Sequence, residues 1–202
     1  AEWWSQGVAI DGHLTPHLVY GRDILQLVKH LFGKPEFTNC MMYGPEEHYT
    51  DEAATERLYN KIHTGKWWAR TQVDIGKGTV IPIVISTDKT TLTQFSGNHT
   101  AYPVYMTIGN IDKETRKKPS SGAWVLLGYL PTGKFDEDDM SDNAARKARA
   151  RLFHASMRIL LKPLIKAGKE GIHLVDSKGR TRLCFPVLAI YPSEKIRPGF
   201  IA

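Results

Sequence analysis

The sequence predicts an α/β fold: a small helical lobe over residues 1–76, then a three-strand meander, a long helix and a parallel strand within residues 77–202. Three observations predict this fold. The run TVIPIVIST at residues 79–87 is almost wholly apolar and β-branched, which is typical of a strand buried on both faces. An amphipathic pattern at helical spacing covers residues 143–167. A second short apolar run, FPVLAIY, covers residues 185–191.

The first lobe is expected to be mainly helical. Residues 1–20 show no clear periodicity, and we interpret them as a loop or a docking strand. Apolar side chains recur at helical spacing over residues 21–32, and a second helix with a threonine cap is predicted over residues 51–63. Trp67 and Trp68 follow, and we interpret this pair as a hydrophobic clasp rather than a base-stacking platform.

The second part of the chain has an informative order of elements. Strands are predicted at residues 79–87, 102–108 and 123–130. The helix of residues 143–167 then crosses over to the strand of residues 185–191, which is expected to run parallel to the first strand. A meander followed by such a crossover is how an RNase H-like fold begins, although other α/β folds share this order.

The boundaries of the long helix are marked in the sequence. Ser141 or Asp142 is expected to cap its start, and Gly168 is expected to close it. Pro163 is expected to kink its last turns. After the helix, two short apolar segments flank the sequence DSKG, which predicts a hairpin turn.

Composition narrows the classes of function. The net charge of +6 favours a polyanionic partner, and nucleic acid is the commonest one. Two cysteines, Cys40 and Cys184, support neither a zinc ribbon nor a disulfide framework. No secretory signal and no membrane-spanning apolar run is visible. The histidines are scattered and share no metal-ligand spacing, and no nucleotide-binding loop or nucleophile elbow is present.

Asp88 is the most informative candidate for chemistry because it ends the apolar strand. A carboxylate at that position can hold a divalent cation, and paired ions of this kind support phosphodiester cleavage. Glu194, just past the strand of residues 185–191, would lie at the same edge of the sheet if the two strands are parallel. The alternatives are that Asp88 caps the following turn and that Glu194 is a solvated tail residue.

Two groups of basic residues are candidates for phosphate contacts. Arg116, Lys117 and Lys118 lie in a connection between strands, and Lys89 follows Asp88 directly. The long helix carries a second set, of which part must point outward and could form a salt-sensitive phosphate track. That set comprises Arg146, Lys147, Arg149, Arg151, Arg158, Lys162 and Lys166. A merely solvated helix face would have the same sequence.

Several long segments resemble one transposase family. From residue 86 the chain contains STDKTTLTQFSGNHTAYPVYMTIGNIDKETRKKPS, followed by VLLGYLP, RLFHASMRILLKPLIKAGKEGI and FPVLAIY. Upstream of these lie RDILQLVKHLFGKPEF, YGPEEHYTDE and RLYNKIHTGKWW. Together these segments, which span about residues 20–191, closely resemble Plavaka transposases of basidiomycete fungi.

The resemblance implies a nuclear cut-and-paste DNA transposase with an RNase H-like domain, an acidic triad and bound Mg²⁺ or Mn²⁺. DNA, as transposon ends and target, would be its partner, and it could form homo-oligomers. The family's first-strand aspartate falls on Asp88. Glu194 stands where the family has its next aspartate, within a stretch that does not match, and Asn98 stands where related sequences often have an acidic residue.

These departures lead to two hypotheses. The first is a catalytic-core fragment, truncated or decayed, that is inactive alone because one secure carboxylate cannot support two-metal catalysis. The second is a non-catalytic module that binds DNA or a transposase partner through its basic helix and N-terminal lobe. A pseudogene product without function is a third possibility.

Overall fold

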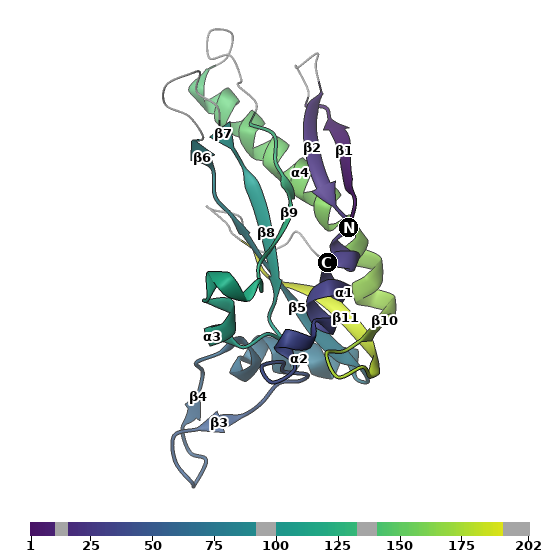
Figure 1. Cartoon of the computed structure of the whole chain (residues 1–202). Helices are drawn as coiled ribbons and strands as arrows, with labels where there is room; N and C mark the ends of the chain where they lie inside the picture. Colours follow the sequence, from purple (N-terminus) through teal and green to yellow (C-terminus); the bar gives the residue numbers. More distant parts are fainter. Residues whose placement is uncertain (11–15, 92–99, 133–140, 192–202) are drawn as a thin grey trace.

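The computed structural model describes residues 1–10, 16–91, 100–132 and 141–191. Its main feature is a mixed seven-stranded sheet with the order β1-β2-β9-β8-β5-β11-β10, while β3–β4 and β6–β7 form separate two-stranded pairs (Figure 1). The larger strands are β1 (Trp3–Val8), β2 (His17–Arg22), β5 (Thr79–Thr87), β8 (Pro103–Ile108), β9 (Val125–Tyr129), β10 (Ile172–Val175) and β11 (Thr181–Ile190). The two-residue strands are β3 (His48–Tyr49), β4 (Arg57–Leu58), β6 (Thr90–Thr91) and β7 (Thr100–Ala101).

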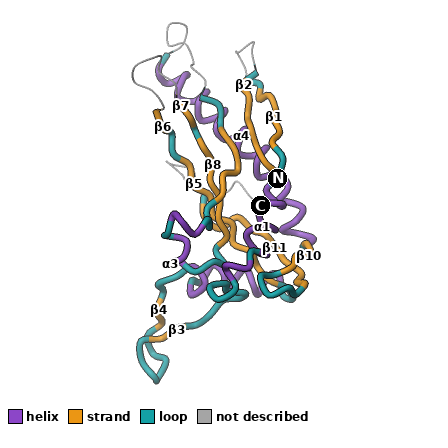
Figure 2. Tube along the Cα trace, viewed as in Figure 1, coloured by secondary structure: helices purple, strands orange, loops and turns teal. Residues whose placement is uncertain are grey.

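The helices are α1 (Ile24–Gly33), α2 (Lys66–Ile75), α3 (Lys113–Arg116) and α4 (Asp142–Glu170), with 3₁₀ turns η1 (Pro35–Phe37), η2 (Ile62–Thr64) and η3 (Pro119–Ser121). Figure 2 shows α4 running along the sheet as the longest helix. No helix in the described ranges is both long and apolar enough to cross a membrane.

β5 occupies the centre of the architecture. It pairs antiparallel with β8 on one side and parallel with β11 on the other. β8 in turn pairs antiparallel with β9, which completes the predicted meander. α4 follows β9 in the chain and leads through β10 to β11. The predicted crossover to a strand parallel to the first is therefore confirmed.

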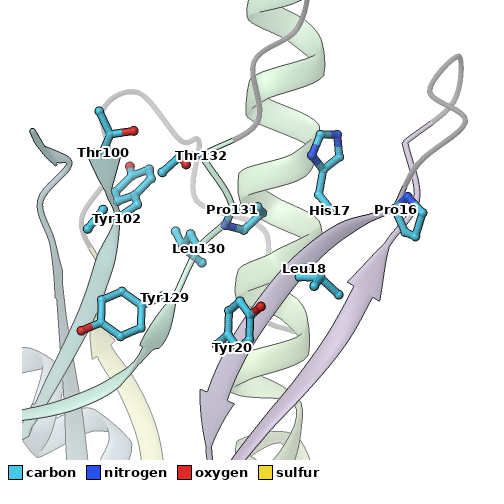
Figure 3. Close-up of a pocket in the computed structure, with 11 residues that line it drawn as sticks. Pro16, His17, Leu18, Tyr20, Thr100, Tyr102, Tyr129, Leu130, Pro131 and Thr132 are labelled. Carbon is cyan, nitrogen blue, oxygen red and sulfur yellow. The ribbon is translucent and has the colours of Figure 1, made fainter. Parts of the chain in front are cut away.

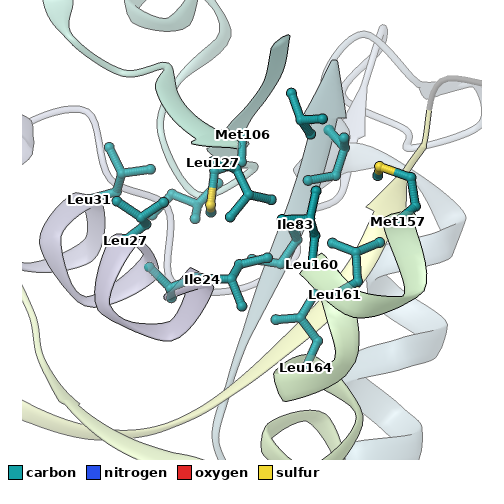
Figure 4. Close-up of a cluster of buried hydrophobic side chains, with 14 of the residues drawn as sticks. Ile24, Leu27, Leu31, Ile83, Met106, Leu127, Met157, Leu160, Leu161 and Leu164 are labelled. Carbon is teal, nitrogen blue, oxygen red and sulfur yellow. The ribbon is translucent and has the colours of Figure 1, made fainter. Parts of the chain in front are cut away.

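β5 is buried on both faces because apolar side chains occupy successive positions along the strand. Ile81, Ile83 and Ile85 belong to the main core cluster, whereas Val80 and Val84 are buried outside that cluster. Successive side chains of a strand point to opposite faces, so the two sets lie on opposite sides of the sheet. α1 and α4 contribute Leu and Ile side chains to the main cluster (Figure 4). α2 packs against β5 and buries Trp68 completely.

α4 matches the predicted helix with one correction. The Ser141 side chain accepts a hydrogen bond from the amide of Ala144, as expected of an N-cap. The helix continues through Pro163 and ends at Gly171, so the prediction that Gly168 closes it was wrong. Gly168 has a different role, because a Cβ there would lie 3.0 Å from the carbonyl oxygen of Pro186 on β11. Gly171 has a φ of 75°, which favours glycine at a helix end.

The predicted helix over residues 51–63 is absent, and that prediction was wrong. The chain forms the β3–β4 hairpin followed by η2. The reason is local: the Asp51 carboxylate accepts hydrogen bonds from the amide and the hydroxyl of Thr55, which closes a turn instead of a helix. The tryptophans lie in α2; Trp68 is buried, as a hydrophobic clasp requires, and Trp67 is partly exposed.

Residues 1–20 include two strands. β1 and β2 pair with each other, and β2 joins β9 through Tyr20 and Gly21. The N-terminal region thus contributes strands to the same sheet as the meander, in agreement with a docking strand rather than a loop. The division into a lobe of residues 1–76 and a domain of residues 77–202 stays a prediction.

The β10–β11 turn depends on one buried carboxylate. Asp176 accepts hydrogen bonds from the amides of Lys178 and Arg180, and it pairs with the Arg180 and Arg182 side chains at 3.1 and 2.7 Å. Burial alone would raise the pKa of Asp176, but the hydrogen bonds from Arg182 and from the turn outweigh it and lower the pKa to about 2. The predicted DSKG hairpin turn is confirmed.

The packing of β2 against β9 yields a first prediction. A Cβ at Gly128 would clash with the carbonyl oxygen of Tyr20 and press on Leu160 of α4. We expect Gly128→Ala to lower the free energy of unfolding by about 1–3 kcal/mol through overpacking. Urea denaturation of both proteins measures the difference. Gly44→Ala is the control, because no atom lies within 4 Å of its added Cβ; equal stabilities of the two variants would contradict the assigned packing.

Asp176 yields a second prediction. Because its folded pKa of about 2 lies below the ordinary value of 3.8, the ionised carboxylate stabilises the fold above the ordinary value. We expect about 2 kcal/mol of unfolding free energy to be lost as the pH falls from about 5 to about 2. Denaturation at both pH values should show that Asp176→Asn removes this part of the pH dependence. The exposed Asp74→Asn should keep it, and the same acid sensitivity in both variants would refute the assignment.

Candidate functional site

Asp88 is the first residue after β5 and is exposed. β5 and β8 pair up to Thr87 and Val104, and β6 and β7 resume the same hairpin register at Thr90 and Ala101. Asp88 therefore lies in a short interruption of one long hairpin, where the ladder of the main sheet ends. No described residue donates a hydrogen bond to its carboxylate, so the alternative of a turn cap has no support within the described ranges.

The carboxyl ends of β5 and β11 share one edge of the sheet. The two strands are parallel, with Val84 opposite Ile190. The chain therefore leaves β11 on the side of the sheet where Asp88 follows β5. Glu194, the second predicted carboxylate, lies outside the described residues, as do Asn98 and the acidic residues 136–139.

An aromatic cluster packs at the same edge. The Phe153 ring on α4 contacts the rings of Tyr102 and Tyr191, with centroids 5.9 and 6.1 Å apart. Burial, with a smaller effect from Tyr102, raises the pKa of Tyr191, so this phenol stays neutral. The cluster joins α4, the residue that follows β11 and the residue between β7 and β8, at the edge of the sheet that carries Asp88.

The basic residues near α3 are not close to Asp88. β8 runs antiparallel to β5, so α3, which follows β8, lies at the opposite end of the sheet (Figure 1). Arg116 turns inward, and its Nε donates to the carbonyl oxygen of Ile111 at 2.9 Å. Burial lowers the pKa of this guanidinium. Lys117 pairs with Glu114 at 3.1 Å, and Lys118 is exposed. Of the predicted basic residues, Lys89 is the exposed neighbour of Asp88.

Five basic residues of α4 form one exposed stripe. Their separations of four and seven residues place them near one line along the helix, opposite the buried side chains. The stripe consists of Lys147, Arg151, Arg158, Lys162 and Lys169. Arg146 and Arg149 are also exposed, and a guanidinium nitrogen of Arg146 donates to the side-chain oxygen of Asn143 at 3.3 Å. Part of the helical set points outward, as predicted.

Comparison with known proteins decides the family. A family model described as Plavaka transposase matches residues 1–195. The chain belongs to the Plavaka transposase family. No curated protein and no solved structure matches it.

In this member of the family a groove of about 600 Å³ opens between β2 and β9 (Figure 3). The two strands pair only at Tyr20–Tyr129 and Gly21–Gly128, and they diverge beyond these pairs. Tyr20 and Tyr129 are exposed at its lower end, and β7, whose partner β6 begins two residues after Asp88, forms part of its wall. The groove thus offers aromatic rings near the carboxyl edge of β5.

Sequence reasoning missed a second group of candidate metal ligands. Glu46, His48 and His63 lie together at the base of the β3–β4 hairpin, although sequence spacing predicted no shared metal-ligand arrangement among the histidines. Burial is the main cause that lowers the pKa of His63, which favours its neutral imidazole. Residues 51–63 were predicted to form a helix, and that prediction hid the β3–β4 hairpin, which brings the chain back so that His63 lies near His48. The pair Glu46-x-His48 was the available signal.

Proposed function

We propose that this member of the Plavaka transposase family uses an RNase H-like core for metal-dependent cleavage of DNA, with Asp88 as the first metal-binding carboxylate. The supporting observation is the position of Asp88 at the carboxyl end of the central strand, beside the parallel strand β11. The sheet order β9-β8-β5-β11 supports an RNase H-like core, because it places a meander next to a parallel strand reached by a helical crossover.

Mg²⁺ or Mn²⁺ is the ion that fits this carboxylate. Mg²⁺ prefers one or two carboxylates together with substrate phosphates and water. The Asp88 side chain suits that role because the residue is exposed and no described residue donates a hydrogen bond to its carboxylate. When bound, the ion would polarise a phosphate oxygen as a Lewis acid. Glu194 is the proposed second carboxylate, on the segment that follows β11.

The role of Asp88 is electrostatic and positional. Its carboxylate would hold the cation at the sheet edge, where the scissile phosphate can share the remaining coordination positions. The pairing of β5 with β8 and β11 restricts movement of this edge, so the carboxylate needs little reorganisation when substrate arrives. Lys89 would offer a cation to an adjacent phosphate.

DNA contact is proposed along the exposed stripe of α4. Its five cations point away from the core, and a line of cations neutralises phosphates without reading sequence. The stripe also supports the alternative function, a non-catalytic module that binds transposon ends or target DNA in the nucleus. The tyrosines of the β2–β9 groove would add stacking surfaces for unpaired bases.

A nicking assay on labelled transposon-end DNA with Mg²⁺ or Mn²⁺ tests the catalytic proposal. We expect Asp88→Ala to reduce cleavage at least ~100-fold, because one metal ligand contributes several kcal/mol of transition-state stabilisation. Asp74→Ala, which removes another exposed aspartate, should leave the rate unchanged. Cleavage that persists in Asp88→Ala would refute the role of Asp88. DNA binding without cleavage by the wild-type chain would favour the non-catalytic module.

Salt dependence tests the DNA-binding surface. We expect the triple variant Lys147→Gln, Arg151→Gln, Lys162→Gln to weaken DNA binding and to reduce the slope of log K against log salt by about 2–3, close to 0.9 per lost phosphate contact. Fluorescence anisotropy at several salt concentrations measures this slope. The double variant Lys117→Gln, Lys118→Gln removes charge at the opposite end of the sheet and should have the smaller effect. The reverse order would place the DNA near α3.

A further inference from the structure

The β3–β4 hairpin brings three potential metal ligands together far from the edge that carries Asp88. Nε2 of His48 lies 2.9 Å from a carboxylate oxygen of Glu46, and Nε2 of His63 lies 3.9 Å from the same oxygen. One ligand atom from each residue can be chosen so that all three lie within 4.8 Å of one another. Within the described residues, a group of three or more histidine, cysteine or acidic side chains with such geometry occurs at Glu46, His48 and His63.

We propose that Glu46, His48 and His63 bind one transition-metal ion of the Zn²⁺ class. Ligands at about 2.0–2.1 Å from a tetrahedral zinc ion are separated from one another by roughly 3.3 Å. The spacings of 2.9 and 3.9 Å bracket this value. Small rotations of the side chains would therefore complete the coordination. An ordinary His–Glu ion pair accounts for the contact of His48, but not for a second imidazole directed at the same carboxylate oxygen.

The backbone already holds the three ligands in place. The amide of Glu46 donates to the carbonyl oxygen of His63 at 3.0 Å, so the two segments are joined directly beside the ligands. His48 pairs with Leu58 across the hairpin. η2 carries His63, and the buried Thr64 hydroxyl accepts the amide of Lys61 there. A site whose ligands are ordered in advance loses little conformational entropy when the ion binds.

The chemistry of the ligands selects the metal. Two imidazoles and one carboxylate suit zinc and related first-row transition metals, whereas Mg²⁺ and Ca²⁺ prefer oxygen ligands throughout. The site is thus distinct from the carboxylate chemistry proposed at Asp88. Three protein ligands leave a fourth position for water. Glu46 and His48 are accessible, with side-chain exposures of 52% and 39%, while His63 is buried, so the ion would bind at the surface with one ligand anchored inside.

Metal binding at this place would fix the hairpin to the body of the protein. β3 and β4 form only two residue pairs, and the hairpin projects from one end of the molecule (Figure 1). Lys61, two residues before His63, pairs with Asp112 at 2.9 Å, just after β8. The ion would therefore connect the hairpin to a segment that is already tied to the end of the central sheet.

The test uses the full 202-residue chain, freed of metal by chelation and titrated with Zn²⁺ by calorimetry. We expect one Zn²⁺ per chain and a zinc-dependent rise in the unfolding temperature, because an ion that binds the folded state stabilises it. Co²⁺ in place of Zn²⁺ should give the visible absorption of a four-coordinate site with nitrogen and oxygen ligands.

Two single variants decide the assignment. His48→Gln and Glu46→Gln change accessible side chains, and circular dichroism checks that both variants stay folded. Each should weaken Zn²⁺ binding at least about 100-fold, since the loss of even an outer partner of a metal ligand commonly costs about 10–100-fold. The control His173→Gln removes an exposed histidine on β10 and should bind Zn²⁺ as the wild type does.

Three outcomes would overturn the proposal: no stoichiometric binding by the wild type, unchanged affinity in the Glu46 and His48 variants, or an equal loss in His173→Gln. None of these readouts depends on DNA cleavage. Failure of the zinc site and failure of the catalytic role of Asp88 are therefore separate results.

Discussion

The burial of β5 on both faces is the constraint on which the rest of the structure depends. A strand with apolar side chains on both sides needs cover on both, and its backbone groups need partners on both edges. α1 and α4 cover one face through Ile81, Ile83 and Ile85, while α2 packs against the strand with Trp68. β8 and β11 satisfy the two edges. The remaining strands extend this centre outward.

The same constraint organises the candidate chemistry. Parallel pairing of β5 with β11 brings their carboxyl ends to one edge. Asp88 follows β5 there, three residues after the last buried side chain of the strand, Ile85. Antiparallel pairing with β8 has the opposite effect on α3, whose basic residues are carried to the far end of the sheet. Residues equally plausible as phosphate contacts in the sequence are therefore separated by strand direction alone. The chain belongs to the Plavaka transposase family, and this edge carries the aspartate that we propose as a metal ligand.

The segment before α2 shows how local hydrogen bonds override a helical pattern. Asp51 and Thr55 bond to each other within four residues, and Ala54 adopts a positive φ of 53° that no helix interior accepts. The chain therefore turns back, and His48 meets His63. A helix over this segment would have kept the two imidazoles apart. The proposed zinc site thus depends on a turn that is stabilised by a hydrogen bond between a side chain and the backbone.

The sequence by itself determined the elements whose signal is local and repeated. The bounds of β5, a cap of α4 at Ser141 or Asp142, the DSKG turn and the place of Asp88 directly after β5 all follow from patterns within a few residues. Only the tertiary structure decided that β1 and β2 join the sheet, that β11 is one continuous strand, and that Glu46, His48 and His63 converge. These features depend on contacts between residues distant in sequence, and such contacts leave no periodic trace along the chain.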